Sequence, residues 1–195
     1  MRVRAAEDAD RPAMRRLLEE AFAEDPFVGW LTSHQPRRRR AYVRLVLDRL
    51  AWRRGCVELC EGPGGALCSV AVWMPPGTWE LTLVEQLRLL PAVFRAVGSR
   101  RFGDAAAASE RVERQRPTAF WYLALVGTAS AHRGRGHGRA VLTPGLARAR
   151  AAGVPALLDT GAEVNLGFYT RLGFVARRQV RLPSGGPLLT TLERV

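Results

Sequence analysis

The chain has 195 residues, 47% of them hydrophobic, and a formal net charge of +12 at pH 7. This length fits one domain, which we expect to span residues 1–195, with enough apolar side chains for a substantial core. All thirty basic residues are arginine, which excludes chemistry by a lysine amine. Because no run approaches the roughly 20 apolar residues of a membrane span, and the first residues lack an apolar segment, we expect a cytoplasmic protein.

The first half of the chain alternates between segments with the period of a helix and short segments rich in strand-forming residues. The predicted helices span 10–23, 38–52, 82–97 with an interruption at Pro91, and 105–114. The predicted strands begin near Val3 and continue with the antiparallel pair 56–60 and 66–74. Asp25-Pro26 is expected to end the first helix.

The second half begins with residues 119–126, which are apolar and aromatic throughout, as expected of a central strand covered on both faces. A helix over 139–151, a short helix from Asn165, and strands at 156–160, 174–182 and 187–193 follow. This order predicts an α/β (α+β) fold with a mixed central β-sheet of about six to seven strands and helices on both faces.

The segment 133–139 follows this central strand directly and alternates arginine or histidine with three glycines. Glycines allow successive backbone N–H groups to converge on an anion, and the start of the next helix adds its dipole and unpaired donors. We therefore predict a ligand with phosphates, most readily a pyrophosphate. The spacing fits neither a P-loop nor a dinucleotide fingerprint. A solvated turn is the alternative.

The order arginine, two residues, glycine, one residue, glycine resembles the coenzyme A loop of the GCN5-related N-acetyltransferases, the GNAT family. A second segment, 165–174, is similar to the fourth motif of that family. The i, i+4 spacing of Asn165 and Tyr169 places both on one helical face, and Gly173 is suited to end the helix. Within the family the chain resembles puromycin N-acetyltransferase and its actinobacterial relatives. That likeness is carried by 21–26, 70–73, 141–146, 153–160 and 168–174.

The resemblance implies the GNAT fold, acetyl-CoA as cofactor, and direct attack of an amine on its thioester. The residues that it implies for cofactor binding are Leu125 and Val126 through their backbone, and Arg133, Gly134, Arg135, Gly136, His137, Gly138, Arg139, Asn165 and Tyr169. Guanidinium groups suit phosphate oxygens, although solvation is the alternative for at least one of these arginines. Asn165 also fits a helix N-cap, and the two roles are compatible.

Tyr169 is implied as the catalytic proton donor, because a phenol with a pKa near ~10 stays protonated at neutral pH. Core packing is the alternative role for Tyr169. Six aromatic residues fall in segments expected around the acceptor, although most of them are expected to pack in the core: Phe27, Trp30, Trp73, Trp79, Trp121 and Tyr122. The substrate-binding candidates among them are Phe27, Trp30, Trp73 and Trp121.

The general base is less clear, because segment 120–126 lacks the glutamate that many relatives carry before the glycine loop. Three acids are candidates by position, with solvated surface residues as the alternative for each: Asp25, Glu80 and Glu163. His34 is a similar candidate. A relay through water would also serve.

The three cysteines, Cys56, Cys60 and Cys68, lack the paired spacing of a zinc site, so buried thiols are expected and no metal is implied. The arginines are scattered and interleaved with acids, apart from the run 37–40. A solvated basic face and an anionic cofactor explain the net charge, so we do not expect a nucleic-acid partner.

We therefore expect an acetyl-CoA-dependent N-acetyltransferase that acts on a small-molecule amine, such as an antibiotic or a metabolite, with a role in antibiotic resistance in the former case. A homodimer is compatible with this expectation. Two alternatives stay open: acetylation of peptide or protein N-termini, and a non-catalytic sensor domain that binds acyl-CoA.

Overall fold

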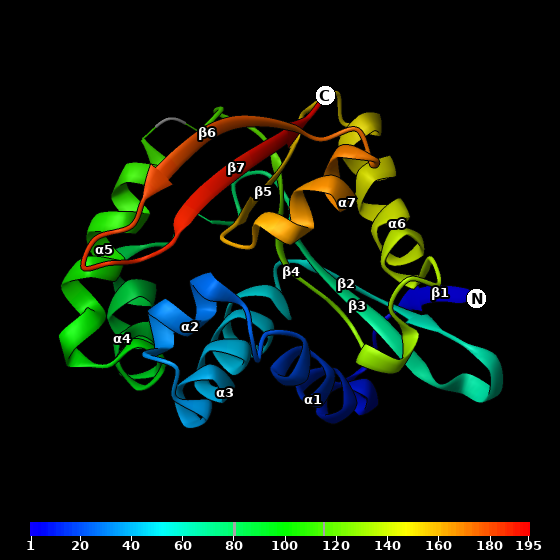
Figure 1. Cartoon of the computed structure of the whole chain (residues 1–195), viewed down its shortest axis with the longest axis horizontal. Helices are drawn as coiled ribbons and strands as arrows, with labels where there is room; N and C mark the ends of the chain where they lie inside the picture. Colours follow the sequence, from blue (N-terminus) through cyan, green and yellow to red (C-terminus); the bar gives the residue numbers. More distant parts are fainter. Residues whose placement is uncertain (80, 115) are drawn as a thin grey trace.

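The computed structural model describes residues 1–79, 81–114 and 116–195. One mixed sheet carries seven strands in the order β1-β2-β3-β4-β5-β7-β6 (Figure 1). The strands are β1 (Arg2–Ala5), β2 (Cys56–Glu61), β3 (Leu67–Met74), β4 (Trp121–Thr128), β5 (Ala156–Thr160), β6 (Val175–Arg181) and β7 (Leu188–Arg194). The β4–β5 pair is parallel, and the other neighbours are antiparallel. The predicted mixed sheet with helices on both faces is confirmed.

The helices are α1 (Arg11–Ala21), α2 (Pro26–Thr32), α3 (Pro36–Arg44), α4 (Leu83–Val97), α5 (Ser99–Glu113), α6 (His137–Ala151) and α7 (Leu166–Thr170). A π-helical stretch, Leu45–Ala51, continues α3. Within the described residues, no helix combines the length and apolarity needed to cross a bilayer.

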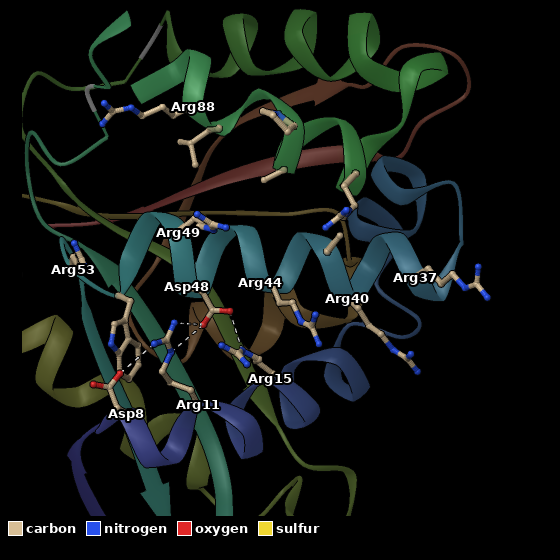
Figure 2. A pocket seen from close by; sticks show the side chains of 16 residues that line it. Asp8, Arg11, Arg15, Arg37, Arg40, Arg44, Asp48, Arg49, Arg53 and Arg88 are labelled. Atoms are coloured by element: carbon tan, nitrogen blue, oxygen red, sulfur yellow. Dashed lines mark hydrogen bonds and ion pairs between the residues drawn. The ribbon is translucent and has the colours of Figure 1, made fainter. Parts of the chain in front are cut away.

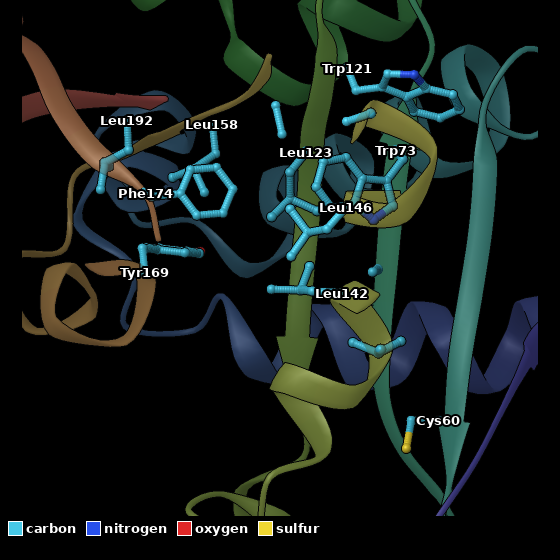
Figure 3. Packing of buried hydrophobic residues seen from close by; sticks show 14 residues of the cluster. Cys60, Trp73, Trp121, Leu123, Leu142, Leu146, Leu158, Tyr169, Phe174 and Leu192 are labelled. Atoms are coloured by element: carbon cyan, nitrogen blue, oxygen red, sulfur yellow. The ribbon is translucent and has the colours of Figure 1, made fainter. Parts of the chain in front are cut away.

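The alternation of β3 side chains separates two layers of the core. Val70 and Val72 pack with residues of α1, α3 and its π-helical continuation on one face of the sheet. Ala71 and Trp73 pack with α6 on the other face, in a cluster that also contains Tyr169 and Phe174 (Figure 3). Burial of alternate residues follows from the period of two in a strand. The two motif-bearing helices, α6 and α7, therefore lie on one face, with α1 opposite.

Several boundaries differ from the sequence prediction, as for α5, which begins at Ser99 and not at residue 105, and two differences involve a proline. Asp25-Pro26 was expected to end a helix, but Asp25 instead begins one: its carboxylate accepts a hydrogen bond from the backbone N–H of Val28 at 2.8 Å, and Pro26 occupies the first turn of α2. The interruption predicted at Pro91 does not occur, because α4 continues through it. Partly buried Leu89, Ala92 and Val93 pack beside the buried end of α4, and such tertiary packing outweighs local propensity.

Strands β4 and β5 separate soon after they meet. Only Trp121 and Tyr122 pair with β5, so the rest of β4 leaves its parallel neighbour. On its other side β4 has an irregularity: Val72 pairs with Leu125 and Trp73 with Leu123, which leaves Ala124 as an extra residue. A bulge re-aims the residues after it. The opening between the strands and the bulge both lie just before the glycine loop.

Candidate active site

A cavity of about 870 Å³ lies where β4 leaves β5, and both sequence motifs reach it. The glycine loop and the start of α6 form one part of its lining, and α7 forms another. Of the predicted cofactor residues, those that line it are Val126, Arg133, Gly134, Gly136, His137, Gly138, Arg139, Asn165 and Tyr169. Leu125 is buried in the core beside α1, and Arg135 is exposed outside this lining.

The glycine loop has the backbone of an anion cradle. Gly134 and Gly136 adopt φ values of 72° and 83°, in the left-handed region that favours glycine. A Cβ at Gly134 would meet nothing within 4 Å, so the backbone there is open to a ligand. Ser69 donates a hydrogen bond of 2.9 Å to the carbonyl of His137 and fixes the start of α6 to β3. The loop thus presents the N-terminus of a 15-residue helix to the cavity.

The arginines of the cavity lie on the loop side and on α7. Arg133 and Arg139 are exposed and line the cavity together with Arg171. Arg171 was not predicted, although its place two residues after Tyr169, directly after the end of α7, is a usable signal. Three guanidinium groups beside open backbone N–H groups fit the phosphates of coenzyme A.

Tyr169 is held at the cavity by its aromatic neighbours. Its ring meets Phe168 at 5.2 Å and Phe174 at 5.9 Å between centroids, both at steep angles. The residue is 6% exposed. Burial raises the pKa of Tyr169 above its ordinary value, and the nearby charge of Asp25 raises it further. The phenol therefore keeps its proton at neutral pH, as a proton donor must.

Asp25 faces the same cavity from the start of α2. Burial raises the pKa of its carboxyl group, while backbone N–H groups of Val28 and Phe27 oppose the shift. A carboxylate with a raised pKa is a stronger base than a solvated one. Glu20 and Glu24 line the cavity beside Asp25, so this wall is acidic and lies in the same cavity as the arginines.

The other candidate bases are placed less favourably. Glu163 is exposed and outside the cavity lining, and His34 is exposed beside α2. Glu80 lies outside the described residues. Among the described candidates, Asp25 alone shares the cavity with Tyr169.

The four aromatic substrate candidates do not gather at this cavity. Trp73 is fully buried and lies so close to α6 that a Cβ at Gly145 would meet its ring at 2.2 Å. Trp121 belongs to the same buried cluster. Trp30 donates to the carbonyl of Pro183, and Phe27 stacks on Trp30 at 6.3 Å. These four aromatic side chains therefore pack against other parts of the protein and do not line the cavity.

A buried polar network secures the point where β4 and β5 part. Asp159 of β5 accepts hydrogen bonds from Arg116 at 2.6 Å, Tyr122 at 3.0 Å and Thr191 at 2.5 Å. Its side chain is 7% exposed. With its lone pairs occupied by donors from three segments, Asp159 is a structural anchor. No sequence pattern indicated this role, because the partners are distant along the chain.

A second cavity, of about 1370 Å³, lies between α1, α3 with its π-helical continuation, and α4. Asp48 there forms ion pairs with Arg11 and Arg15 (Figure 2). Arginines that are scattered along the sequence gather in its lining: Arg11, Arg15, Arg37, Arg40, Arg44, Arg49, Arg53, Arg88 and Arg95. Nine of the thirty arginines therefore line this one cavity.

Comparison with known proteins finds acetyltransferases, both by sequence and by fold. Residues 96–174 match the model of the acetyltransferase (GNAT) family. A structure described as histone acetyltransferase HPA2 and related acetyltransferase, from Corynebacterium glutamicum, is 27% identical, with a TM-score of 0.73 over 98% of this chain and 94% of that one.

Two further solved structures share the fold at lower identity. Polyamine N-acetyltransferase from Drosophila melanogaster is 16% identical, with a TM-score of 0.68 over 98% of both chains. Ribosomal-protein-alanine N-acetyltransferase from Brucella melitensis is also 16% identical, with a TM-score of 0.60 over 100% of this chain and 99% of that one. The family model thus matches the part of the chain that carries both sequence motifs, and the solved structures share its fold.

Proposed function

We propose that this protein is an acetyl-CoA-dependent N-acetyltransferase whose acceptor is a small-molecule amine, acting in the cytoplasm. The observation that carries the proposal is that one cavity is lined by the glycine loop, the phenol of Tyr169 and the carboxyl group of Asp25. Acetyl-CoA, when bound, supplies an activated acetyl group as a thioester. The remaining tasks belong to the side chains and backbone of this chain.

The loop side of the cavity is suited to hold the cofactor. The backbone N–H groups at Gly134 and Gly136 and the guanidinium groups of Arg133 and Arg139 are proposed to bind its phosphates. Val126, after the bulge of β4, is proposed to offer backbone polar groups to its arm. Asn165 makes no capping hydrogen bond at the start of α7, so its amide is available to the cavity.

The opposite wall is suited to prepare the amine. An amine is an ammonium ion in neutral water and must lose a proton before it can attack a carbonyl. We propose that Asp25 takes this proton at its carboxylate oxygen, and that Tyr169 holds a proton at its hydroxyl for the leaving group. Glu20 and Glu24 add negative charge that favours entry of a cationic amine.

Two observations support a small-molecule amine as the acceptor: the acidic wall of Glu20, Glu24 and Asp25, and the resemblance to known acetyltransferases. The Drosophila neighbour is a polyamine N-acetyltransferase, and an acidic wall fits amines of that kind. The resemblance to puromycin N-acetyltransferase supports an amine on an aromatic nucleoside, which would give the protein a role in antibiotic resistance. A homodimer is compatible with this proposal but is not needed for it, because every residue given a role above comes from one chain.

The test is to follow thiol release from acetyl-CoA with mass detection of the product. The acceptor panel contains puromycin-like nucleosides, polyamines, arylalkylamines, aminoglycosides and short peptides with an N-terminal alanine. We expect acetylation of a small amine. Acetylation of peptides alone would contradict the acceptor class. Binding of acetyl-CoA without acetylation of any acceptor would favour a sensor domain.

A further inference from the structure

Two cysteines and two histidines gather beside the glycine loop, and the two histidines also line the cavity described above. The ligand atoms of Cys68, His132 and His137 all lie within 4.8 Å of one another. Cys68 and His137 are buried and His132 is half-buried. We infer that these three side chains form a binding site for a transition-metal ion, with zinc as the class that fits best.

The separations suit a tetrahedral ion. Zinc lies about 2.3 Å from a cysteine sulfur and about 2.0–2.1 Å from a histidine nitrogen, which places neighbouring ligand atoms roughly 3.5 Å apart. The ligand atoms of this cluster lie within 4.8 Å of one another, so binding would draw them somewhat closer together. One soft thiolate and two imidazoles are ligands typical of zinc and of cobalt, whereas calcium and magnesium prefer oxygen.

The surroundings leave room for the site and orient one of its ligands. A Cβ at Gly62 would lie 2.8 Å from the sulfur of Cys68 and 3.8 Å from Cε1 of His137, so glycine keeps this space open. The sulfur of Cys60 lies 3.5 Å from Nδ1 of His137. We assign Cys60 the role of holding the His137 ring in place, a task that neighbours of metal ligands commonly perform. The ion would have three protein ligands, so its fourth position would be open to water.

Sequence spacing could not reveal this site, because its ligands come from three elements. Cys68 lies in β3, His132 ends the 3-10 turn after β4, and His137 begins α6. The two histidines therefore flank the loop 133–136, and the ion would tie both ends of that loop to β3. On binding, the thiol of Cys68 loses its proton to solvent as the sulfur–metal bond forms.

The experiment uses the full chain after removal of metal with a chelator. Cobalt(II) is titrated as a coloured substitute for zinc, and zinc is then added to displace it. We expect one ion per chain, a thiolate-to-cobalt charge-transfer absorption, release of a proton, and a higher Tm in the presence of zinc. Absence of the absorption band in the wild-type protein overturns the inference.

The chain supplies its own matched controls, since it has three cysteines and three histidines. Cys68→Ser and His132→Gln should weaken zinc binding by more than 100-fold, and Cys60→Ser by about 10- to 100-fold. Cys56→Ser and His34→Gln should bind zinc as the wild type does. Retention of the cobalt band in Cys68→Ser, or its loss in Cys56→Ser, overturns the assignment.

His132→Gln guards against loss of folding, because the half-buried His132 side chain lies on the short 3-10 turn that follows β4. Without metal, this variant should unfold at the same Tm as the metal-free wild type. It should lack the rise in Tm on addition of zinc. An equal rise in both proteins contradicts the site. None of these measurements requires acetyl-CoA, so the outcome is independent of the proposed acetyltransferase activity.

Discussion

Replacement of Asp25 by asparagine separates two roles that the structure gives to one side chain. The carboxylate caps α2 through Val28 at 2.8 Å and also faces the cavity that Tyr169 lines. Asparagine caps helices about as well as aspartate, so Asp25→Asn should keep the fold. It cannot accept a proton from an ammonium ion, so this variant should lose the proposed general base.

The expected magnitudes differ for the two roles. A general base contributes about 10²- to 10⁴-fold to the rate, or roughly 3–5 kcal/mol, and this factor should be lost from kcat/KM. Stability should change by only a few tenths of a kcal/mol. Asp25→Ala should lose the same activity and in addition about 1 kcal/mol of stability, or roughly 2–4 °C in Tm, because the cap is removed as well.

The pH dependence gives a second signature. Burial raises the pKa of Asp25, so in the wild type kcat/KM should fall on the acid side at a pH above the usual aspartate value of about 4. The folded state holds this proton more tightly than the unfolded state. Stability should therefore decrease as the pH rises from the unfolded to the folded pKa, and Asp25→Asn should lack both effects.

The assay is kcat/KM for the preferred amine between acid and neutral pH, with thermal unfolding of each variant in parallel. Glu163→Gln serves as the comparison, because Glu163 is exposed and outside the cavity. It should keep its activity within about threefold, as expected for a surface carboxylate. Wild-type kcat/KM in Asp25→Asn would refute the assignment of the base.

Three further predictions concern the cofactor side and the core. Tyr169→Phe keeps the packing of the ring, so it should retain Tm and acetyl-CoA affinity while kcat falls by about 10²-fold or more; unchanged kcat would contradict a proton donor. Arg133→Gln should weaken acetyl-CoA binding, measured by calorimetry, by about tenfold or less, with a smaller effect at high salt. Gly145→Ala places a Cβ 2.2 Å from the Trp73 ring and should lower the free energy of unfolding, measured in urea, by about 1–3 kcal/mol. The control Gly103→Ala places a Cβ that meets nothing within 4 Å and should raise the free energy of unfolding by about 0.5–1 kcal/mol. Equal effects of the two substitutions would show that the Trp73 ring moves aside at no cost.

Local pattern indicated the segments of the candidate site that are continuous in sequence. The loop 133–139 and the segment from Asn165 to Tyr169 are each short and continuous, so their residue spacing can be seen in the sequence. Residues of both segments line one cavity. The strand 156–160 was predicted with its observed boundaries. Such features depend on backbone conformation and helical period, which neighbouring residues determine.

The parts that escaped prediction depend on contacts between distant segments. An aromatic residue looks the same in sequence whether it lines a pocket or fills a core, and only the placement of Trp73 against α6 distinguishes the two. The cap formed by Asp25 was missed because Asp-Pro signals both the end of one helix and the start of the next. The cluster around Cys68 required the topology itself.

The brief pairing of β4 with β5 has a consequence for how the molecule holds together. The sheet consists of two antiparallel blocks, β1-β2-β3-β4 and β5-β7-β6. Only two residue pairs, both between β4 and β5, join the blocks. Each block has its own continuous hydrogen bonding, so each is suited to behave as a cooperative unit, with the seam as the weakest line of the sheet. A ligand bound along that seam contacts both blocks at once. Its binding energy would then oppose separation of the two halves, in addition to serving the chemistry.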